Sequence, residues 1–191
     1  MGGTFNPVHN AHLIIAENAR EEYSLDKVIF ITGGNPPHKK SNVTAQHRFN
    51  MTRIAIKDNK FFTDDDFEIN LSQKSYTVNT LRYLKDKYPY DDLFFIIGED
   101  SLVNFKDWYM PEKILKMCSI LVFPRVSHSG LADTIKKVKL HFEGNIMAVH
   151  SPIMEISSTD IRKRFKEGRT IKYLVPEGVI EYIKDNHLYK E

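Results

Sequence analysis

Short apolar runs alternate with amphipathic stretches along most of this chain, and this alternation restricts the possible folds more than any other feature. The apolar runs are residues 27–32, 93–97, 120–123 and 146–149, and the helix-like stretches are residues 11–23, 78–87, 111–117, 159–166 and 177–186. Runs that are apolar on both faces are typical of strands in a parallel sheet covered by helices on two sides. The sequence therefore predicts an α/β fold with a parallel sheet and helices on both faces.

Length and composition indicate one globular domain. A chain of 191 residues has the size of a single domain and buries about 70% of its surface on folding. At 41% apolar and 27% charged residues, it is unlike disordered or low-complexity chains. We expect one domain over residues 1–191, with a C-terminal helical part, residues 157–191, packed on it.

Charge, apolar length and cysteine content exclude several classes of function. A net charge of +2 gives no concentrated basic surface for nucleic acid. No apolar stretch reaches the roughly 18 residues of a membrane span, and the first residues do not show a basic region followed by an apolar core, so we expect neither membrane insertion nor secretion. The one cysteine, Cys118, lies in an apolar run, which favours a buried, inert thiol and a reducing cytoplasm. We expect a cytoplasmic protein without nucleic-acid or membrane partners, and the sequence leaves homo-oligomerisation open.

The chain opens with GGTFNPVHNAH, which has the composition of a phosphate-binding turn. Two glycines and a threonine precede a helix whose first backbone N–H groups and dipole favour an anion. His9 and His12 are three residues apart and can lie on one side of the first helical turn, where imidazoles donate to phosphate. Two surface histidines beside an ordinary turn, or a metal site, are the alternatives. A glycine turn of this kind normally follows a strand, so we expect the first strand to be missing from this numbering.

The segment EISSTDIR near the other end predicts a second helix start. Ser157 and Asp160 have the spacing of a capping box, and the cap alone is a sufficient explanation for them. Ser158 and Arg162 lie one turn apart at the same helix end, where hydroxyl and guanidinium groups also suit a phosphate chain. Spacing alone does not establish that this segment meets the opening turn.

These two motifs together resemble the HxGH nucleotidylyltransferases, and most closely the bacterial nicotinate-mononucleotide adenylyltransferases. Four further segments are similar to that family: the PPHK loop at residues 36–39, SYT at 75–77, IGED at 97–100 and the pair Trp108-Tyr109. The resemblance covers almost the whole chain. It implies a Rossmann-like nucleotidylyltransferase fold and adenylyl transfer from ATP to nicotinate mononucleotide in NAD biosynthesis, with Mg²⁺ held mainly by the phosphates.

The resemblance also implies roles for individual residues. Charge stabilisation at the reacting phosphates falls to His9, His12 and Arg162. ATP contacts fall to Gly2, Gly3, Thr4, Phe5, Gly98, Asp100, Ile156, Ser157 and Ser158, and contacts to the mononucleotide fall to Lys39, Thr77, Trp108 and Tyr109. No residue is assigned to a protein-held metal. The three acids within residues 61–67 (FFTDDDF) are expected in a solvated turn.

Three residues depart from the family pattern. Asn6 replaces the usual Asp, Ala11 replaces the glycine of HxGH, and Glu99 replaces a small residue in IGAD. Neither Asn6 nor Ala11 removes a histidine, so catalysis is still expected. The alternatives are a sister enzyme that uses nicotinamide mononucleotide or phosphopantetheine, and a nucleotide-binding module without turnover.

Overall fold

The computed structural model describes residues 1–34, 43–124 and 130–190, and these residues form an α/β structure with parallel strands. One sheet has the order β1-β2-β3 and the other the order β4-β5-β6. Their bounds are β1 Gly2–Gly3, β2 Val28–Thr32, β3 Phe62–Asp65, β4 Phe94–Gly98, β5 Ser119–Phe123 and β6 Ile146–Ala148. Every neighbouring pair of these strands is parallel. The predicted parallel α/β fold is confirmed.

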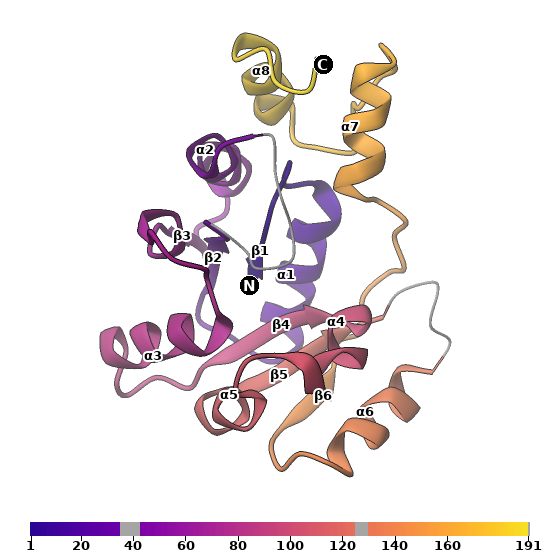
Figure 1. Ribbon diagram of the computed structural model, residues 1–191. Helices are drawn as coiled ribbons and strands as arrows, with labels where there is room; N and C mark the ends of the chain where they lie inside the picture. Colours follow the sequence, from indigo (N-terminus) through magenta and orange to yellow (C-terminus); the bar gives the residue numbers. More distant parts are fainter. Residues whose placement is uncertain (35–42, 125–129, 191) are drawn as a thin grey trace.

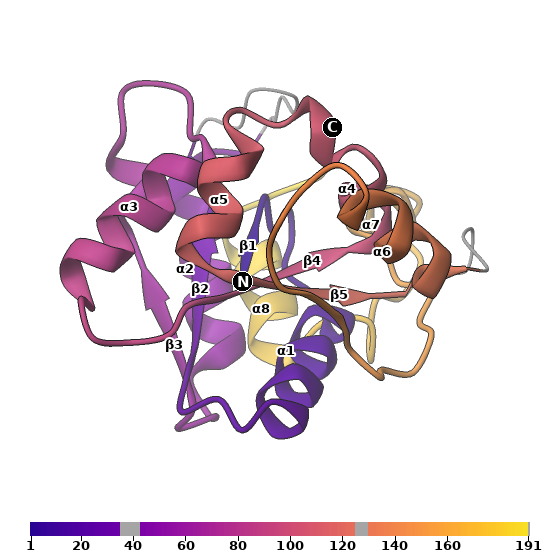
Figure 2. The same ribbon diagram turned by 90° about the horizontal axis from the view of Figure 1, so that it is seen from below.

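Helices connect the strands and cover the sheets (Figure 1). Their bounds are α1 Asn10–Glu22, α2 Ala45–Ile56, α3 Thr77–Lys87, α4 Glu99–Val103, α5 Pro111–Met117, α6 Leu131–Lys139, α7 Ser158–Lys166 and α8 Glu177–Asp185. Seen from below in Figure 2, α3 and α5 lie on one side of the strands and α1 on the other. Helices on both sides of the strands are what connections between parallel strands of one sheet require, because each connection has to cross over the sheet.

The opening glycines form a strand rather than the expected turn. Gly2 pairs with Ile31 and Gly3 with Thr32, so β1 is an edge of the first sheet. A Cβ on Gly3 would lie 2.6 Å from the ring of Phe5, so the close approach of that ring requires glycine. The turn itself falls between β1 and α1, over residues 4–9.

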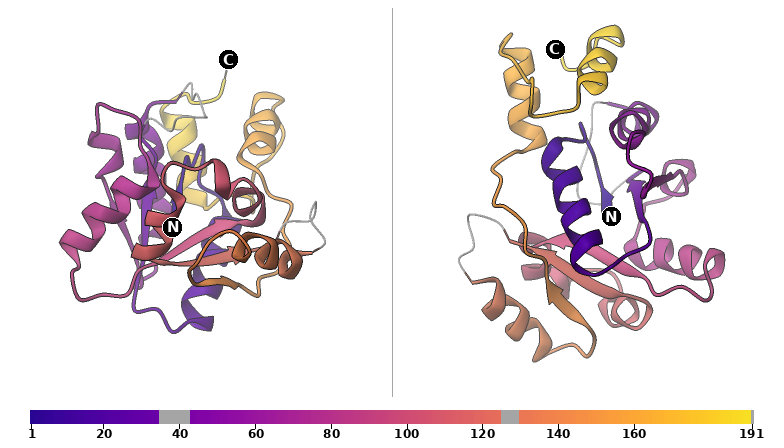
Figure 3. Two further views of the ribbon diagram at one scale, coloured as in Figure 1. Left: turned by 60° about the horizontal axis from the view of Figure 1, so that its bottom comes forward. Right: turned by 180° about the vertical axis from the view of Figure 1, so that it is seen from behind.

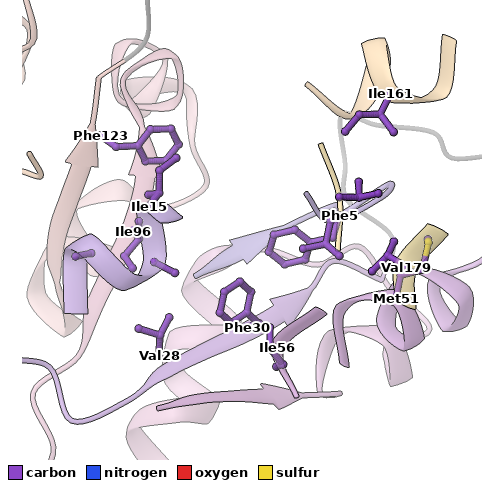
Figure 4. Close-up of a cluster of buried hydrophobic side chains, with 14 of the residues drawn as sticks. Phe5, Ile15, Val28, Phe30, Met51, Ile56, Ile96, Phe123, Ile161 and Val179 are labelled. Carbon is purple, nitrogen blue, oxygen red and sulfur yellow. The ribbon is translucent and has the colours of Figure 1, made fainter. Parts of the chain in front are cut away.

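One apolar core joins the beginning and the end of the chain. Figure 4 shows Phe5 and Phe30 from the first sheet region packed in the same cluster as Met51 of α2, Ile161 of α7 and Val179 of α8. In Figure 3 the α7 and α8 helices stand together at one end of the molecule, beside α1 and α2. The C-terminal segment is therefore placed next to the turn that leads into α1.

The acidic segment at residues 61–67 is not the solvated turn that the sequence predicts. It contains β3, and Asp65 is buried. The Asp65 carboxylate accepts hydrogen bonds from Lys87 Nζ at 2.8 Å and from the Tyr83 hydroxyl at 3.2 Å. The prediction was wrong because these partners, some 20 residues away, compensate the buried charge.

Candidate active site

The turn between β1 and α1 brings His9 and His12 together. His9 is the residue before α1, and its backbone N–H donates to Nδ1 of His12 at 3.2 Å. The two imidazole rings stack with centroids 3.7 Å apart. Because Nδ1 of His12 accepts a hydrogen bond, the neutral ring carries its proton on Nε2. The fold thus presets His12 as an Nε2–H donor.

The Phe5 side chain packs against the ring of His12. The backbone of Phe5 has a left-handed φ of 47°, and its side chain is only 2% exposed. The Phe5 ring meets the His12 ring edge to face at a centroid distance of 5.0 Å. The apolar core therefore fixes the position of His12, while Phe5 can offer a ligand only its backbone.

The second motif reaches the same turn from the far end of the chain. The Ser158 hydroxyl donates to the carbonyl oxygen of Pro7 at 2.9 Å, and Nη1 of Arg162 donates to that of Asn6 at 2.8 Å. Ser157 caps α7 by accepting from the Asp160 N–H at 3.1 Å. Residues about 150 positions apart in the sequence thus contact the same turn. The hydroxyl and guanidinium groups of the second motif therefore lie in the same region as the two imidazoles.

Arg48 is a functional candidate that sequence reasoning missed. It is 2% exposed, and its Nη1 donates at 2.6 Å to both the Thr4 and the Gly33 carbonyl oxygens, while Nη2 donates to Gly34 at 3.0 Å. Burial lowers the pKa of Arg48 from its usual value. This guanidinium links the end of β1 to the end of β2 and places a positive charge next to the turn that begins at Thr4.

A cleft of about 1640 Å³ opens beside β1. The expected site residues that line it are Gly2, Gly3, Thr4, Thr77, Asp100, Trp108 and Tyr109. The Trp108 and Phe95 rings have centroids 6.0 Å apart, and the Tyr109 and Tyr76 rings have centroids 4.9 Å apart. The cleft therefore has aromatic side chains in its lining together with the glycines of β1, and a planar aromatic ligand fits such a lining.

β4 ends at Gly98, and Glu99 and Asp100 are the first residues of α4. A Cβ on Gly98 would lie 2.4 Å from Oδ1 of Asp100, so glycine lets this side chain turn back over the strand end. Glu99 is fully buried and does not line the cleft; its Oε1 accepts from the Thr134 hydroxyl at 3.1 Å. The glutamate at position 99, which departs from the family pattern, thus links the start of α4 to α6.

Other expected site residues lie elsewhere. Lys39 falls outside the described residues. The Ile156 side chain packs against the apolar core that contains Phe5 and Phe30, which we call the main core. Only the backbone of Ile156 is therefore left to contact a ligand. Within residues 1–34, 43–124 and 130–190, no three or more His, Cys, Asp or Glu side chains form a group that could hold a metal ion. Nor does any helix in those ranges have the length and apolarity to cross a membrane.

Arg48 had a weak signal in the sequence. Arg48, Thr52 and Ile56 follow one another at four-residue spacing, and all three are buried on one side of α2. An arginine on such an apolar side indicates carbonyl or carboxylate partners. The sequence does not say which partners they are, because Thr4, Gly33 and Gly34 reach it only through the fold.

Comparisons with known proteins agree with this geometry. The family model described as cytidylyltransferase-like matches residues 1–164. A Clostridium botulinum protein named "probable nicotinate-nucleotide adenylyltransferase" is 40% identical over 195 residues, covering 100% of this chain and 97% of the relative. A protein of the same name from Exiguobacterium sibiricum is 43% identical over 190 residues, covering 99% and 96%.

Solved structures share the fold. Nicotinic acid mononucleotide adenylyltransferase of Plasmodium falciparum, in a structure with NaAD, superposes with a TM-score of 0.83 at 22% identity, covering 98% of this chain and 94% of that one. At this identity the likeness bears on the fold alone. It confirms the nucleotidylyltransferase-type fold.

Proposed function

This chain belongs to the cytidylyltransferase-like family, and from that premise we propose that it transfers the adenylyl group of ATP to nicotinate mononucleotide in NAD biosynthesis. A phosphate oxygen of the mononucleotide attacks the α-phosphorus of ATP. The bond from that phosphorus to the oxygen bridging to the β-phosphorus breaks, and pyrophosphate leaves. The product is nicotinic acid adenine dinucleotide.

One observation supports this proposal above the others. The histidine turn and the Ser158–Arg162 segment are joined by the hydrogen bonds to the Pro7 and Asn6 carbonyl oxygens. A transfer between two phosphorylated substrates needs donors on both sides of one phosphate chain, because the charge develops on the leaving pyrophosphate. This turn brings both sets of donors together.

The two motifs bind different parts of the ATP phosphate chain in this proposal. Nε2–H of His12, with His9 stacked beside it, donates to the oxygens around the α-phosphate. Arg162 and the start of α7 hold the β- and γ-phosphates, and the helix dipole assists them. The catalyst needs no covalent intermediate, since positioning and charge stabilisation are sufficient for this class of reaction.

The cleft beside β1 holds the two substrates' organic parts. Trp108 stacks on the pyridine ring, and the backbone near Thr77 and Tyr109 donates to its carboxylate. Gly98 and Asp100 meet the adenosine at the end of β4. Lys39 keeps its proposed contact to the mononucleotide, although it lies outside the described residues.

We propose that Mg²⁺ enters with ATP. The residues near the described turn are imidazole, hydroxyl and guanidinium groups, and this donor set suits phosphate oxygens better than a hard cation. The metal would therefore take phosphate and water ligands and would neutralise charge on the leaving group. The cytoplasmic location and the oligomeric state stay predictions.

The test is pyrophosphate release by the purified chain. We expect release to require ATP, Mg²⁺ and a pyridine mononucleotide together, and to be faster with nicotinate mononucleotide than with nicotinamide mononucleotide. Faster turnover with phosphopantetheine would assign the chain to a sister activity. ATP binding by calorimetry without pyrophosphate from any acceptor would contradict catalysis.

A further inference from the structure

The C-terminal segment contacts the histidine turn at more points than the motif residues alone provide. Asn10, the first residue of α1, donates its backbone N–H to the Leu174 carbonyl oxygen at 2.9 Å. Its side-chain Nδ2 donates to the Tyr173 carbonyl oxygen at 2.7 Å. The segment that follows α7 therefore holds the turn where the helix begins.

The end of the chain then returns to the start of the same turn. The Tyr189 hydroxyl donates to Oδ1 of Asn6 at 2.6 Å, across 183 positions of sequence. Tyr189 is half-buried and packs against the main core. Burial raises the pKa of its phenol, against the opposing effect of the Arg162 and Arg48 charges, so the hydroxyl keeps its proton and remains a donor at neutral pH.

Asn6 is consequently held through both its main chain and its side chain. Arg162 binds its carbonyl oxygen and Tyr189 binds its amide oxygen. Asn6 precedes His9 by three residues, with Pro7 between them held by Ser158. A rotation of the Asn6 peptide would carry along the backbone N–H of His9, which sets the proton position of His12.

We propose that Tyr189 is a positioning residue for adenylyl transfer, which makes the C-terminal tail part of the active site. Through Asn6 it keeps the turn in the geometry in which His9 and His12 face the reacting phosphate. This inference rests on the proposed function and deepens it. Tyr189 itself touches no substrate; it acts by way of the turn.

The direct test is Tyr189→Phe, which removes the hydroxyl and keeps the ring in the core. We expect kcat to fall about three- to tenfold, the equivalent of one hydrogen bond, because the donors are aligned less well in the transition state. The KM for nicotinate mononucleotide should stay within twofold, since the aromatic side chains that line the cleft are untouched. A folded variant with the wild-type kcat would overturn the proposal.

A double-mutant cycle separates positioning from packing. If Tyr189 acts through Asn6, the Asn6→Ala variant loses activity similarly, and adding Tyr189→Phe to it costs little more. Asn6→Asp keeps an acceptor for the hydroxyl and should retain the dependence on Tyr189. Additive losses in the Ala cycle would show that the tail acts elsewhere.

Tyr182→Phe is the matched control. Its hydroxyl contacts Nδ1 of His47 and Nδ2 of Asn50, each at 2.9 Å, and so fastens α8 to α2 without reaching the turn. This variant should unfold at a lower urea concentration and keep its kcat within twofold. An equal loss of kcat in both tyrosine variants would mean that Tyr189 contributes only to the stability of the fold, and it would contradict the positioning role.

A measurement without turnover keeps this proposal separate from the proposed function. The imidazole NMR signals of His9 and His12 should shift in Tyr189→Phe and stay in place in Tyr182→Phe. Unchanged signals in Tyr189→Phe would overturn the positioning role. A wild-type chain that releases no pyrophosphate, yet shows these shifts, would contradict the proposed function alone.

Discussion

At the residue scale, the histidine turn fixes a hydrogen position by backbone contact. Nδ1 of His12 accepts from the His9 N–H, so the donor that can face a phosphate is Nε2–H. The amide oxygen of an asparagine at position 12 could replace Nδ1 as acceptor, but asparagine has no group where Nε2 lies. The His12→Asn variant therefore tests the phosphate-facing donor separately from the turn.

We expect His12→Asn to lower kcat by about a hundred- to a thousandfold, the usual loss for one preorganised donor to developing charge. Its free energy of unfolding should stay near that of the wild type, whereas His12→Ala should lose both activity and some stability. Pyrophosphate release and urea unfolding measure the two effects. His141→Ala, which changes an exposed histidine, is the control, and a His12→Asn enzyme of normal kcat would refute the assigned role.

Trp108 offers a second prediction at this scale, because it is the only tryptophan in the chain. Nicotinate mononucleotide should quench its fluorescence on binding, and ATP alone should have much less effect. Trp108→Ala should raise the KM for the mononucleotide roughly three- to tenfold, as expected for one lost aromatic pair, with little change for ATP. Trp108→Phe should recover most of this loss. An equal rise in both KM values would place the indole outside the pyridine site.

Motif residues could be predicted from the sequence, but the residues that hold them could not. His9, His12, Ser158 and Arg162 stand in short patterns whose spacing has chemical meaning. Arg48 and Tyr189 act through backbone carbonyls and one amide oxygen that are distant in sequence. No local pattern records such contacts, so only the folded chain identifies them.

At the scale of elements, Arg48 joins three pieces of secondary structure. It lies on α2 and binds the carbonyl oxygens at the ends of β1 and β2. Arg48→Met keeps the apolar stem and leaves these buried oxygens without a donor. Because each unpaired buried carbonyl costs about 1–3 kcal/mol, we expect the free energy of unfolding to fall by on the order of 3 kcal/mol.

Activity should fall in the same Arg48→Met variant, since Thr4 and Gly33 line the cleft in which we propose that ATP binds. Arg48→Lys keeps the charge, but one ammonium cannot reproduce the planar fork that reaches both strand ends. It should recover part of the stability and less of the kcat. Urea unfolding and pyrophosphate release check these outcomes, and wild-type stability in Arg48→Met would contradict the role of the guanidinium as a tie between the strands.

Elements with local signals were predicted well. The bounds predicted for α5 agree with the structure, and those for β2, β4 and β5 differ by at most one residue, because these strands are apolar on both faces. In contrast, β1 consists of two glycines, and β3 carries Asp64 and Asp65. Such residues disfavour strands locally, and their pairing partners come from other parts of the chain.

At the scale of the whole molecule, the proposed mechanism depends on the contact between the two ends of the chain. Spacing could not establish it, because residues 6–7 and 158–162 are brought together only by the order of strands and by the core that Phe5 shares with Ile161 and Val179. The family resemblance supplied this expectation, and the structure agrees with it. Burial raises the pKa of the Cys118 thiol to about 12. In contrast to the contact between the chain ends, this burial could be predicted from the sequence, because the neighbours of Cys118 in the chain are apolar.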